Sequence, residues 1–175
     1  MSELGLTNTL SIIILTFNES IHIQRCIESI KKLSARIVIV DSFSTDNTCE
    51  LAKDSGSEIF QNPFTTQAQQ FQWAMDNCNI NTDWVLRLDA DETIDDELVA
   101  NINCFIEENG SGHNGAIFHR KHIFLGKWVK HGGRYPLPML RLFRRGTAHV
   151  EQRWMDEHIV LDEGTNCVLR GGFSD

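Results

Sequence analysis

The chain has 175 residues, of which 41% are hydrophobic and 23% charged, and its formal net charge at pH 7 is −8. This is the composition of an ordinary soluble globular protein, and it excludes an intrinsically disordered chain. No segment approaches the roughly 18 apolar residues of a membrane span, and the first residues lack the pattern of a secretion signal. The five cysteines are widely spaced and odd in number, which argues against a closed disulfide framework. We therefore expect a cytoplasmic protein.

Charge is distributed unevenly along the chain. Residues 1–112 carry a net charge of −12, whereas residues 113–175 carry +4. Nine of the sixteen lysines and arginines lie between Arg120 and Arg153, where Glu151 is the only acidic residue. Such a block attracts phosphate groups or an anionic membrane surface, although exposed basic residues can also serve solubility alone. Overall acidity and the lack of a recognisable nucleic-acid-binding motif argue against a nucleic acid partner.

The first part of the chain alternates predicted strands with predicted helices. Apolar runs of strand length predict strands at residues 10–15, 36–40 and 84–88, and a short strand is expected at 58–60, after the helix stop at Gly56. Apolar residues at helical spacing predict four helices, at residues 20–33, 46–55, 67–78 and 95–107. This alternation is typical of a mostly parallel sheet with right-handed crossovers. It places the carboxyl ends of the first, second and fourth strands at one edge of the sheet.

Residues 113–175 have a different pattern. Shorter β-type segments at 116–125 and 140–144 flank a stretch at 132–138 that contains glycine and proline. We expect this part to be antiparallel or mixed, and to belong to one domain that spans residues 1–175. The ending R-G-G-F-S-D predicts neither a helix nor a strand, so we expect either a truncated chain or one that continues in a longer protein.

The most informative segment is W-V-L-R-L-D-A-D-E-T at residues 84–93. Asp89 and Asp91 are two residues apart, so in an extended chain both side chains point to the same face at the end of a strand. Two converging carboxylates can hold Mg²⁺ or Mn²⁺, which takes its remaining ligands from water and from the phosphates of a substrate. Alternatively, these acids only begin the next helix, because acidic residues stabilise a helix N-terminus.

The other two strand ends carry polar residues without a glycine-rich phosphate loop. Thr16, Phe17, Asn18 and Glu19 follow the first strand, where the NAD and ATP fingerprints are missing. A nucleotide could dock on the backbone of this segment, or Asn18 and Glu19 could simply cap the next helix. Asp41 ends the second strand, and its carboxylate could accept the N–H of a pyrimidine base.

Three motifs, in this order and spacing, carry a resemblance to a known family: S-I-I-I-L-T-F-N-E, V-I-V-D-S-F-S-T-D-N-T and D-W-V-L-R-L-D-A-D-E. Together they resemble family 2 inverting glycosyltransferases of the GT-A fold, especially the bacterial subgroup that builds lipopolysaccharide core or other surface polysaccharides. The resemblance covers residues 10–108, and residues 128–158 match more loosely. It implies an α/β, Rossmann-like fold with a mostly parallel central sheet and a smaller mixed or antiparallel part.

The resemblance implies that residues 1–112 bind a nucleotide sugar, which we expect to be UDP-linked. Thr16, Phe17 and Glu19 would line the nucleotide pocket, and Asp41 would contact a uracil-type base. Asp89 would lie near the ribose and the metal. Asp91 would ligate Mg²⁺ or Mn²⁺, which bridges the diphosphate and neutralises the charge on the leaving group.

The resemblance also implies that residues 113–175 face the acceptor, a glycan or a lipid-linked molecule at the inner face of the membrane. Inversion needs a carboxylate that takes the proton of the acceptor hydroxyl. Glu157 and Asp156 are the candidates, but the subgroup more often has Val-His-Glu here, so the choice between them stays open and both could merely cap a turn. Trp154 and Arg141 are candidates for acceptor contact, and Arg144 and Arg145 could either join Arg141 in holding an acidic group or be solvated.

Two other functions fit parts of the sequence. Residues 89–93 also match the D-x-D-x-T signature of haloacid-dehalogenase-like phosphatases, in which Asp89 would be the nucleophile and Asp91 the general acid. That signature normally follows the first strand of its fold, whereas here three predicted strands precede it. The third possibility is a sugar-binding protein without catalytic activity.

Overall fold

The computed structural model describes residues 9–124, 127–129, 135–151 and 157–175. Its four α-helices are α1 (Ile23–Ile30), α2 (Thr48–Asp54), α3 (Gln67–Asn77) and α4 (Asp96–Glu107), and a 3-10 turn follows at Asn109–Gly112. The strands of the first part are β1 (Leu10–Thr16), β2 (Arg36–Asp41), β3 (Glu58–Gln61), β4 (Trp84–Asp89) and β5 (Thr93–Ile94). Those of the second part are β6 (Gly115–Lys121), β7 (Ile123–Phe124), β8 (Lys127–Trp128), β9 (Leu137–Arg144), β10 (Ala148–Val150), β11 (Ile159–Leu161) and β12 (Asn166–Ser174).

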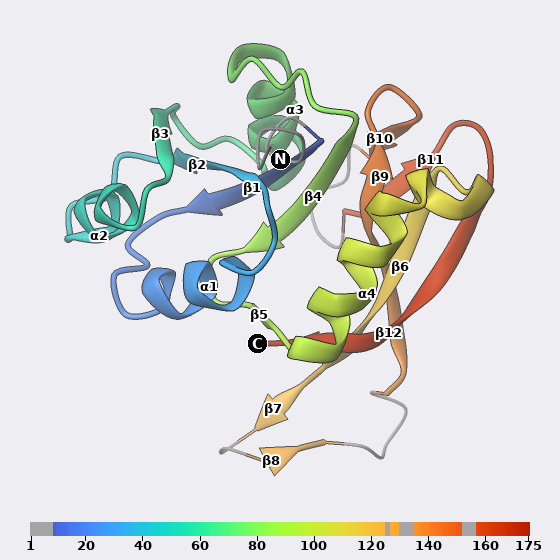
Figure 1. Ribbon diagram of the computed structural model, residues 1–175. Helices are drawn as coiled ribbons and strands as arrows, with labels where there is room; N and C mark the ends of the chain where they lie inside the picture. The colour runs from blue at the N-terminus through green and yellow to red at the C-terminus, as the bar shows by residue number, and fades with distance from the viewer. Residues whose placement is uncertain (1–8, 125–126, 130–134, 152–156) are drawn as a thin grey trace, which may run out of the picture.

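One eight-stranded sheet, in the order β3-β2-β1-β4-β9-β6-β12-β5, runs through the molecule (Figure 1). The strands β3, β2, β1 and β4 are parallel, which confirms the predicted alternation of strands and helices. All seven residues of β1 are buried, as expected for a strand between two neighbours with helices on its faces. Helix α1 is shorter than the predicted 20–33, because residues 20–22 form a turn in which His22 N–H donates to the Glu19 carbonyl.

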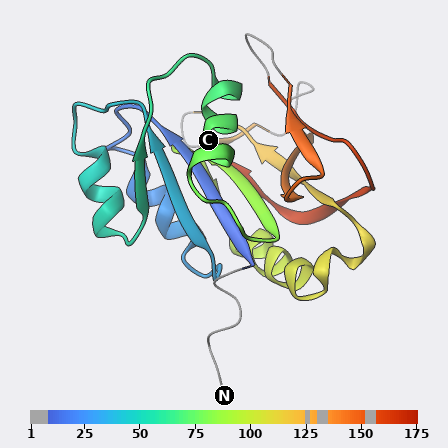
Figure 2. The same cartoon turned by 90° about the horizontal axis from the view of Figure 1, so that it is seen from above.

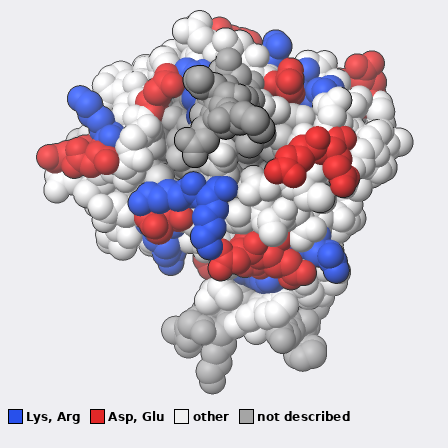
Figure 3. Space-filling model, viewed as in Figure 1, with Lys and Arg blue, Asp and Glu red and all other residues white. Residues whose placement is uncertain are grey.

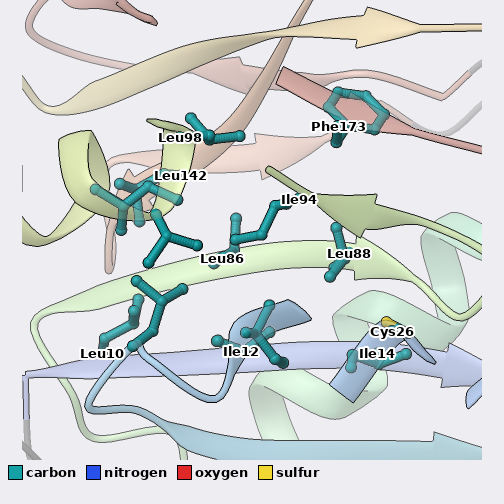
Figure 4. Packing of buried hydrophobic residues seen from close by; sticks show 14 of the residues in the cluster. Leu10, Ile12, Ile14, Cys26, Leu86, Leu88, Ile94, Leu98, Leu142 and Phe173 are labelled. Carbon is teal, nitrogen blue, oxygen red and sulfur yellow. The ribbon is translucent and has the colours of Figure 1, made fainter. Parts of the chain in front are cut away.

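The side chains of β1 alternate between two hydrophobic clusters, one on each face of the sheet. Ile12 and Ile14 pack in the cluster that includes residues of α1, α2 and α4. Ile13 and Leu15 pack on the other face with residues of α3, β10 and β11. Figure 2 shows α3 and α4 on opposite sides of the sheet, and Figure 4 shows side chains of β1, β4 and β9 meeting between the strands and helices. Within the described ranges, no helix is long and apolar enough to cross a membrane.

The second part of the sheet is mixed, as predicted. Strand β9 lies antiparallel between β4 and β6, although these three strands are far apart in the sequence. Strand β9 is longer than the predicted 140–144 and contains Pro138. Pro138 pairs with His119 of β6, but only residues 142–144 of β9 pair with β4. At Pro138 the strand therefore has a neighbour on one side only, and a residue without a backbone N–H is tolerated there.

The prediction that the chain ends without a strand was wrong. Strand β12 pairs parallel with β6 and antiparallel with β5, and its register against β6 shifts between Val168 and Gly172. Gly171 has φ +93°, and a Cβ at this position would lie 2.4 Å from the backbone nitrogen of Leu98 in α4. The glycine pair therefore forms a bulge that fits closely against α4 instead of ending the strand.

Candidate functional site

The carboxyl ends of β1, β2 and β4 meet at one edge of the sheet, as the sequence predicted. The strand register pairs Thr16 with Asp41, and Leu15 with Asp89. A cleft of about 590 Å³, hereafter the first cleft, opens at this edge. Five residues predicted for a site line it: Thr16, Phe17, Glu19, Asp89 and Asp91. Ligands of open α/β sheets bind at this position.

Of the five other residues that line the first cleft, Ser42, Phe64 and Gln67 have polar or aromatic side chains that the sequence did not assign to a site. Phe17 and Phe64 are 58% and 55% exposed, so two aromatic rings present their surfaces to the opening. Phe64 follows β3 in a connection without a recognisable motif. Its exposed aromatic ring in an otherwise polar segment is the one feature that could have drawn attention to it.

Hydrogen bonds tie the loop after β1 to the loop after β2. The backbone N–H of Asn18 donates to the Ser44 hydroxyl (2.8 Å), and the N–H of Thr45 donates to Oδ1 of Asn18 (2.9 Å). The N–H of Glu19 donates to the Thr48 hydroxyl (2.8 Å). Asn18 has φ 54°, a left-handed conformation in which asparagine is enriched. Asn18 therefore holds the wall of the first cleft together, a role different from the helix cap considered above.

Asp41 lies behind this wall and is fully buried. Its carboxylate accepts hydrogen bonds from the Thr16 hydroxyl (2.9 Å), from the N–H of Ser44 (2.8 Å) and from the Ser44 hydroxyl. Burial opposes ionisation, but the hydrogen bonds from Ser44, Cys49 and Thr16 outweigh it and lower the pKa of Asp41. In this structure Asp41 is thus a charged anchor for the two loops, and its predicted contact with a base stays a prediction.

A tight turn after β4 holds the two aspartates of the D-x-D motif. The N–H of Asp89 donates to Oε2 of Glu92 (2.9 Å), and the N–H of Glu92 donates to the Asp89 carbonyl (3.0 Å). Asp91 is exposed at the cleft. The cap of α4 is Asp95, whose carboxylate accepts from the N–H of Leu98 (2.8 Å) after the intervening strand β5. The alternative that Asp89 and Asp91 begin this helix is therefore wrong.

Glu92 connects the turn to the second part of the sheet, a role that the sequence did not predict. It is 2% exposed, and its Oε1 accepts a hydrogen bond from Nη2 of Arg141 on β9 (2.8 Å). The same Nη2 lies 3.5 Å from Oδ2 of Asp89. Burial raises the pKa of Glu92 to about 7, against the opposing attraction of Arg141. Glu92 and Arg141 therefore fix the backbone that positions Asp89.

The D-x-D carboxylates fit a hard divalent cation. Oδ1 of Asp89 is buried and has no hydrogen-bond partner among the described residues, and Nε of Arg87 is 3.7 Å away from it. Across the described ranges, no three side chains of His, Cys, Asp or Glu gather into a metal-binding cluster. The described part of the chain thus offers two carboxylates at most. Mg²⁺ is commonly bound in this way, with waters and substrate phosphates as its other ligands.

A second cleft, of about 240 Å³, adjoins the first and shares Gln67, Asp89 and Asp91 with it. Glu157, one of the two candidate bases, lines this second cleft and is half-buried. The other candidate, Asp156, and the predicted acceptor residue Trp154 lie outside the described residues. The D-x-D motif therefore stands where the two clefts meet.

The arginines at and after the end of β9 point to different places. Arg141 lines the second cleft. Arg144 instead donates to Oδ1 of Asn109 (2.9 Å) and lies 4.5 Å above the ring of Trp84, and Arg145 donates to the carbonyl of Thr82 (2.9 Å). On the face shown in Figure 3, acidic side chains lie beside the basic ones. The basic block of the sequence is thus divided between separate structural roles.

Several curated proteins are similar to parts of the chain. An uncharacterized glycosyltransferase of Rickettsia bellii is 39% identical over 98 residues, which are 56% of this chain and 32% of that protein. The lipopolysaccharide core biosynthesis glycosyltransferase LpsC of Rhizobium meliloti is 39% identical over 51% of this chain and 34% of its own length. The succinoglycan biosynthesis protein ExoA of Rhizobium meliloti is 35% identical over 93% of this chain and 59% of its own. The chain thus spans about a third of the first relative.

Solved structures share the fold at low sequence identity. TarS of S. aureus, residues 1–349, aligns with a TM-score of 0.60 and 18% identity over 78% of this chain and 47% of TarS. Its complex with UDP-GlcNAc aligns with a TM-score of 0.55 and 20% identity over 70% and 37% of the two chains. Glucosyl-3-phosphoglycerate synthase of Mycobacterium tuberculosis, solved with Mn²⁺ and UDP, has a TM-score of 0.50 at 18% identity over 66% and 44%.

The match to a family model extends through both parts of the sheet. The model described as glycosyl transferase family 2 matches residues 11–170, which include the three motifs, the D-x-D turn and most of β12. The mixed α/β sheet and its structural neighbours confirm the predicted GT-A fold. The chain belongs to glycosyl transferase family 2.

Proposed function

We propose that the chain transfers a sugar from a nucleotide donor, expected to be UDP-linked, to a bacterial surface glycan or a lipid-linked acceptor, with inversion at the anomeric carbon. The observation that carries the proposal is the position of Asp89 and Asp91 at the junction of two clefts. The names of LpsC and ExoA support a role in surface polysaccharide synthesis. The UDP-GlcNAc complex of TarS supports the donor class. The reaction would take place in the cytoplasm, at the inner face of the membrane.

In this proposal the first cleft, built by residues 1–112, holds the nucleotide. The exposed rings of Phe17 and Phe64 offer flat apolar surfaces to a base, and Glu19 offers an acceptor for a polar edge. A base that reached Asp41 would have to displace one of its present hydrogen-bond donors. The contact from Nε2 of Gln61, at 3.4 Å, is long and would give way most easily.

Asp91, with Asp89, would hold Mg²⁺ or Mn²⁺. When bound, such an ion would supply positive charge that stabilises the leaving nucleoside diphosphate. The protein contributes the placement of its ligands, because Glu92 and Arg141 fix the turn before any donor arrives. The Mn²⁺ and UDP complex of the mycobacterial synthase supports this assignment.

The second cleft, built with residues 113–175, would hold the acceptor, and Glu157 or Asp156 would be the base. The carboxylate takes the proton of the acceptor hydroxyl while that oxygen forms a bond to the anomeric carbon. The bond from this carbon to the diphosphate oxygen breaks on the opposite face, which inverts the configuration. The choice of Glu157 is supported by its position in the cleft that Asp89 and Asp91 also line. Arg141 and Trp154 remain proposed acceptor contacts.

The phosphatase alternative is not favoured. Family membership supports a transferase, and the D-x-D motif follows a strand that three others precede in the chain. A calorimetric screen of UDP, GDP, CDP and dTDP sugars, each with and without Mn²⁺, tests the proposal. We expect the chain to bind sugars of one particular nucleotide, and to bind them only when Mn²⁺ is present. Release of phosphate from small phosphoesters, without binding of any nucleotide sugar, would support the phosphatase instead.

A further inference from the structure

Three arginines line the second cleft: Arg87 of β4, Arg120 of β6 and Arg141 of β9. Arg141 and Arg87 are only 4% and 7% exposed. Buried guanidinium nitrogens without a hydrogen-bond partner among the described residues occur on all three: Nε of each, and Nη1 of Arg141. Folded proteins pair nearly all buried polar groups, and an unpaired one on a charged side chain is costly. Such a concentration around one cleft calls for a ligand.

The neighbouring acids occupy only part of each guanidinium. Arg141 uses Nη2 for Glu92, and Arg120 uses Nη2 for Asp175. Arg87 has a 3.4 Å contact from Nη2 to Gln67, and its Nε is 3.7 Å from Asp89. The Arg87 guanidinium also lies over the ring of Phe71, with its central carbon 5.7 Å from the ring centroid. Arg87 is thus a buried cation held by long contacts, with nitrogens left for another acceptor.

We propose that these three arginines form a subsite for an anionic group, a phosphate or a carboxylate, on the acceptor. The inference rests on the proposed function and adds a substrate class to it, an acidic acceptor. Guanidinium groups suit both anions, because their N–H donors match two oxygens at once. Glu157 lines the same cleft, so an anion held there places the attached sugar beside the proposed base.

The arrangement assigns the anion to the acceptor and not to the donor. The nucleotide belongs to the first cleft, and Asp89 and Asp91 stand between that cleft and the second. Without a cation these two carboxylates repel an incoming anion. A divalent ion cancels their charge. Each remaining acid then has an arginine beside it: Glu92 pairs with Arg141, Asp175 pairs with Arg120, and Glu157 is attracted to Arg87. The acidic acceptor therefore binds best after the ion and the nucleotide.

Calorimetry with the whole chain tests the subsite, using saturating UDP and Mg²⁺ to fill the first cleft. The probes are glucose 6-phosphate, glucuronate and uncharged glucose, so the two charged arms tell phosphate from carboxylate. We expect at least one charged sugar to bind about tenfold more tightly than glucose, as charge-assisted hydrogen bonds imply. Without Mg²⁺ this preference weakens.

The variant Arg120→Gln should abolish most of the preference. It is the safest change, because the Arg120 side chain is 35% exposed and Asp175 keeps a contact to Nδ1 of His122 (3.3 Å). Arg87→Gln is the second variant, used if its melting temperature matches that of the wild type. Arg170→Gln removes the same charge from an exposed position of β12 and should leave the preference unchanged.

Equal binding of glucose and both charged sugars would overturn the subsite, and so would an equal loss in Arg170→Gln. A preference seen only while the first cleft is empty would assign the arginines to the donor diphosphate, which also overturns it. Failure of the proposed function looks different, because UDP itself would then not bind with Mg²⁺. In that case the charged-sugar preference is measured with Mg²⁺ alone, and its loss in Arg120→Gln but not in Arg170→Gln still reports on the second cleft.

Discussion

The two clefts that meet at the D-x-D motif are built in different ways. The wall of the first is formed by consecutive loops whose polar groups bond to one another, as in the Asn18, Ser44 and Thr45 contacts. The second is formed by β4, β6 and β9, which are distant in sequence and bring together guanidinium nitrogens that lack partners among the described residues. The loop wall of the first cleft therefore has its polar groups paired before a ligand arrives, whereas the arginines of the second cleft require a ligand to satisfy their charges.

The largest expected effect separates chemistry in the second cleft from binding in the first. Glu157→Gln should preserve donor binding and slow sugar transfer by about 10²- to 10⁴-fold, the usual contribution of a general base. Single-turnover transfer and UDP calorimetry measure the two effects. Asp156→Asn is the companion variant. Full turnover by both variant proteins would show that neither Glu157 nor Asp156 is the catalytic base.

A stability change tests how closely the second part of the sheet is packed. Gly171→Ala places a methyl group against the backbone of Leu98 and forces a non-glycine residue to φ +93°. We expect the free energy of unfolding to fall by about 3 kcal/mol, since strain and overlap add. Gly56→Ala is the control, because its φ is +86° but no atom lies within 4 Å of the new Cβ. Equal losses in the two variants would show that the close fit against α4 contributes nothing.

The smallest expected effect concerns the anchor behind the first cleft. Asp41→Asn removes the charge that accepts from Thr16 and Ser44, and should lower the free energy of unfolding by about 2 kcal/mol at pH 7. Because folding lowers the pKa of Asp41, this contribution is present above its ordinary pKa and is lost as the pH falls through the folded value. Urea unfolding from pH 7 to pH 3 should show the variant and the wild type converging. A difference that grows toward low pH would contradict the account.

The sequence was most informative where patterns are local. The strands β1, β2 and β4 were predicted because each is a largely apolar run, and the D-x-D motif was recognised because its two acids are only two residues apart. The same reasoning failed at β12, where the ending R-G-G-F-S-D showed neither a helix nor a strand pattern. Only the packing of α4 against this strand shows why glycine is needed there.

Side chains that act across the sheet were harder to predict. Arg87 lies inside an apolar run, and a charged residue in a buried strand was an indication of a partner or a ligand. Alternation along β9 would not have separated Arg141 from Arg144, because the register of β9 against β6 shifts between Leu140 and Leu142. The pairing of Glu92 with Arg141 needs the antiparallel contact between β4 and β9, and no local pattern predicts which strands become neighbours.

The binding of UDP in the presence of Mn²⁺, measured by calorimetry on Asp91→Asn and the wild type, tests the central claim most directly. Asp91 is exposed, so the variant should melt close to the wild type while its Mn²⁺-dependent affinity for UDP falls by at least about 100-fold. Asp54→Asn, an equally conservative change at an exposed position of α2, should bind as the wild type does. Unchanged UDP affinity in Asp91→Asn with Mn²⁺ present would contradict the proposed metal site.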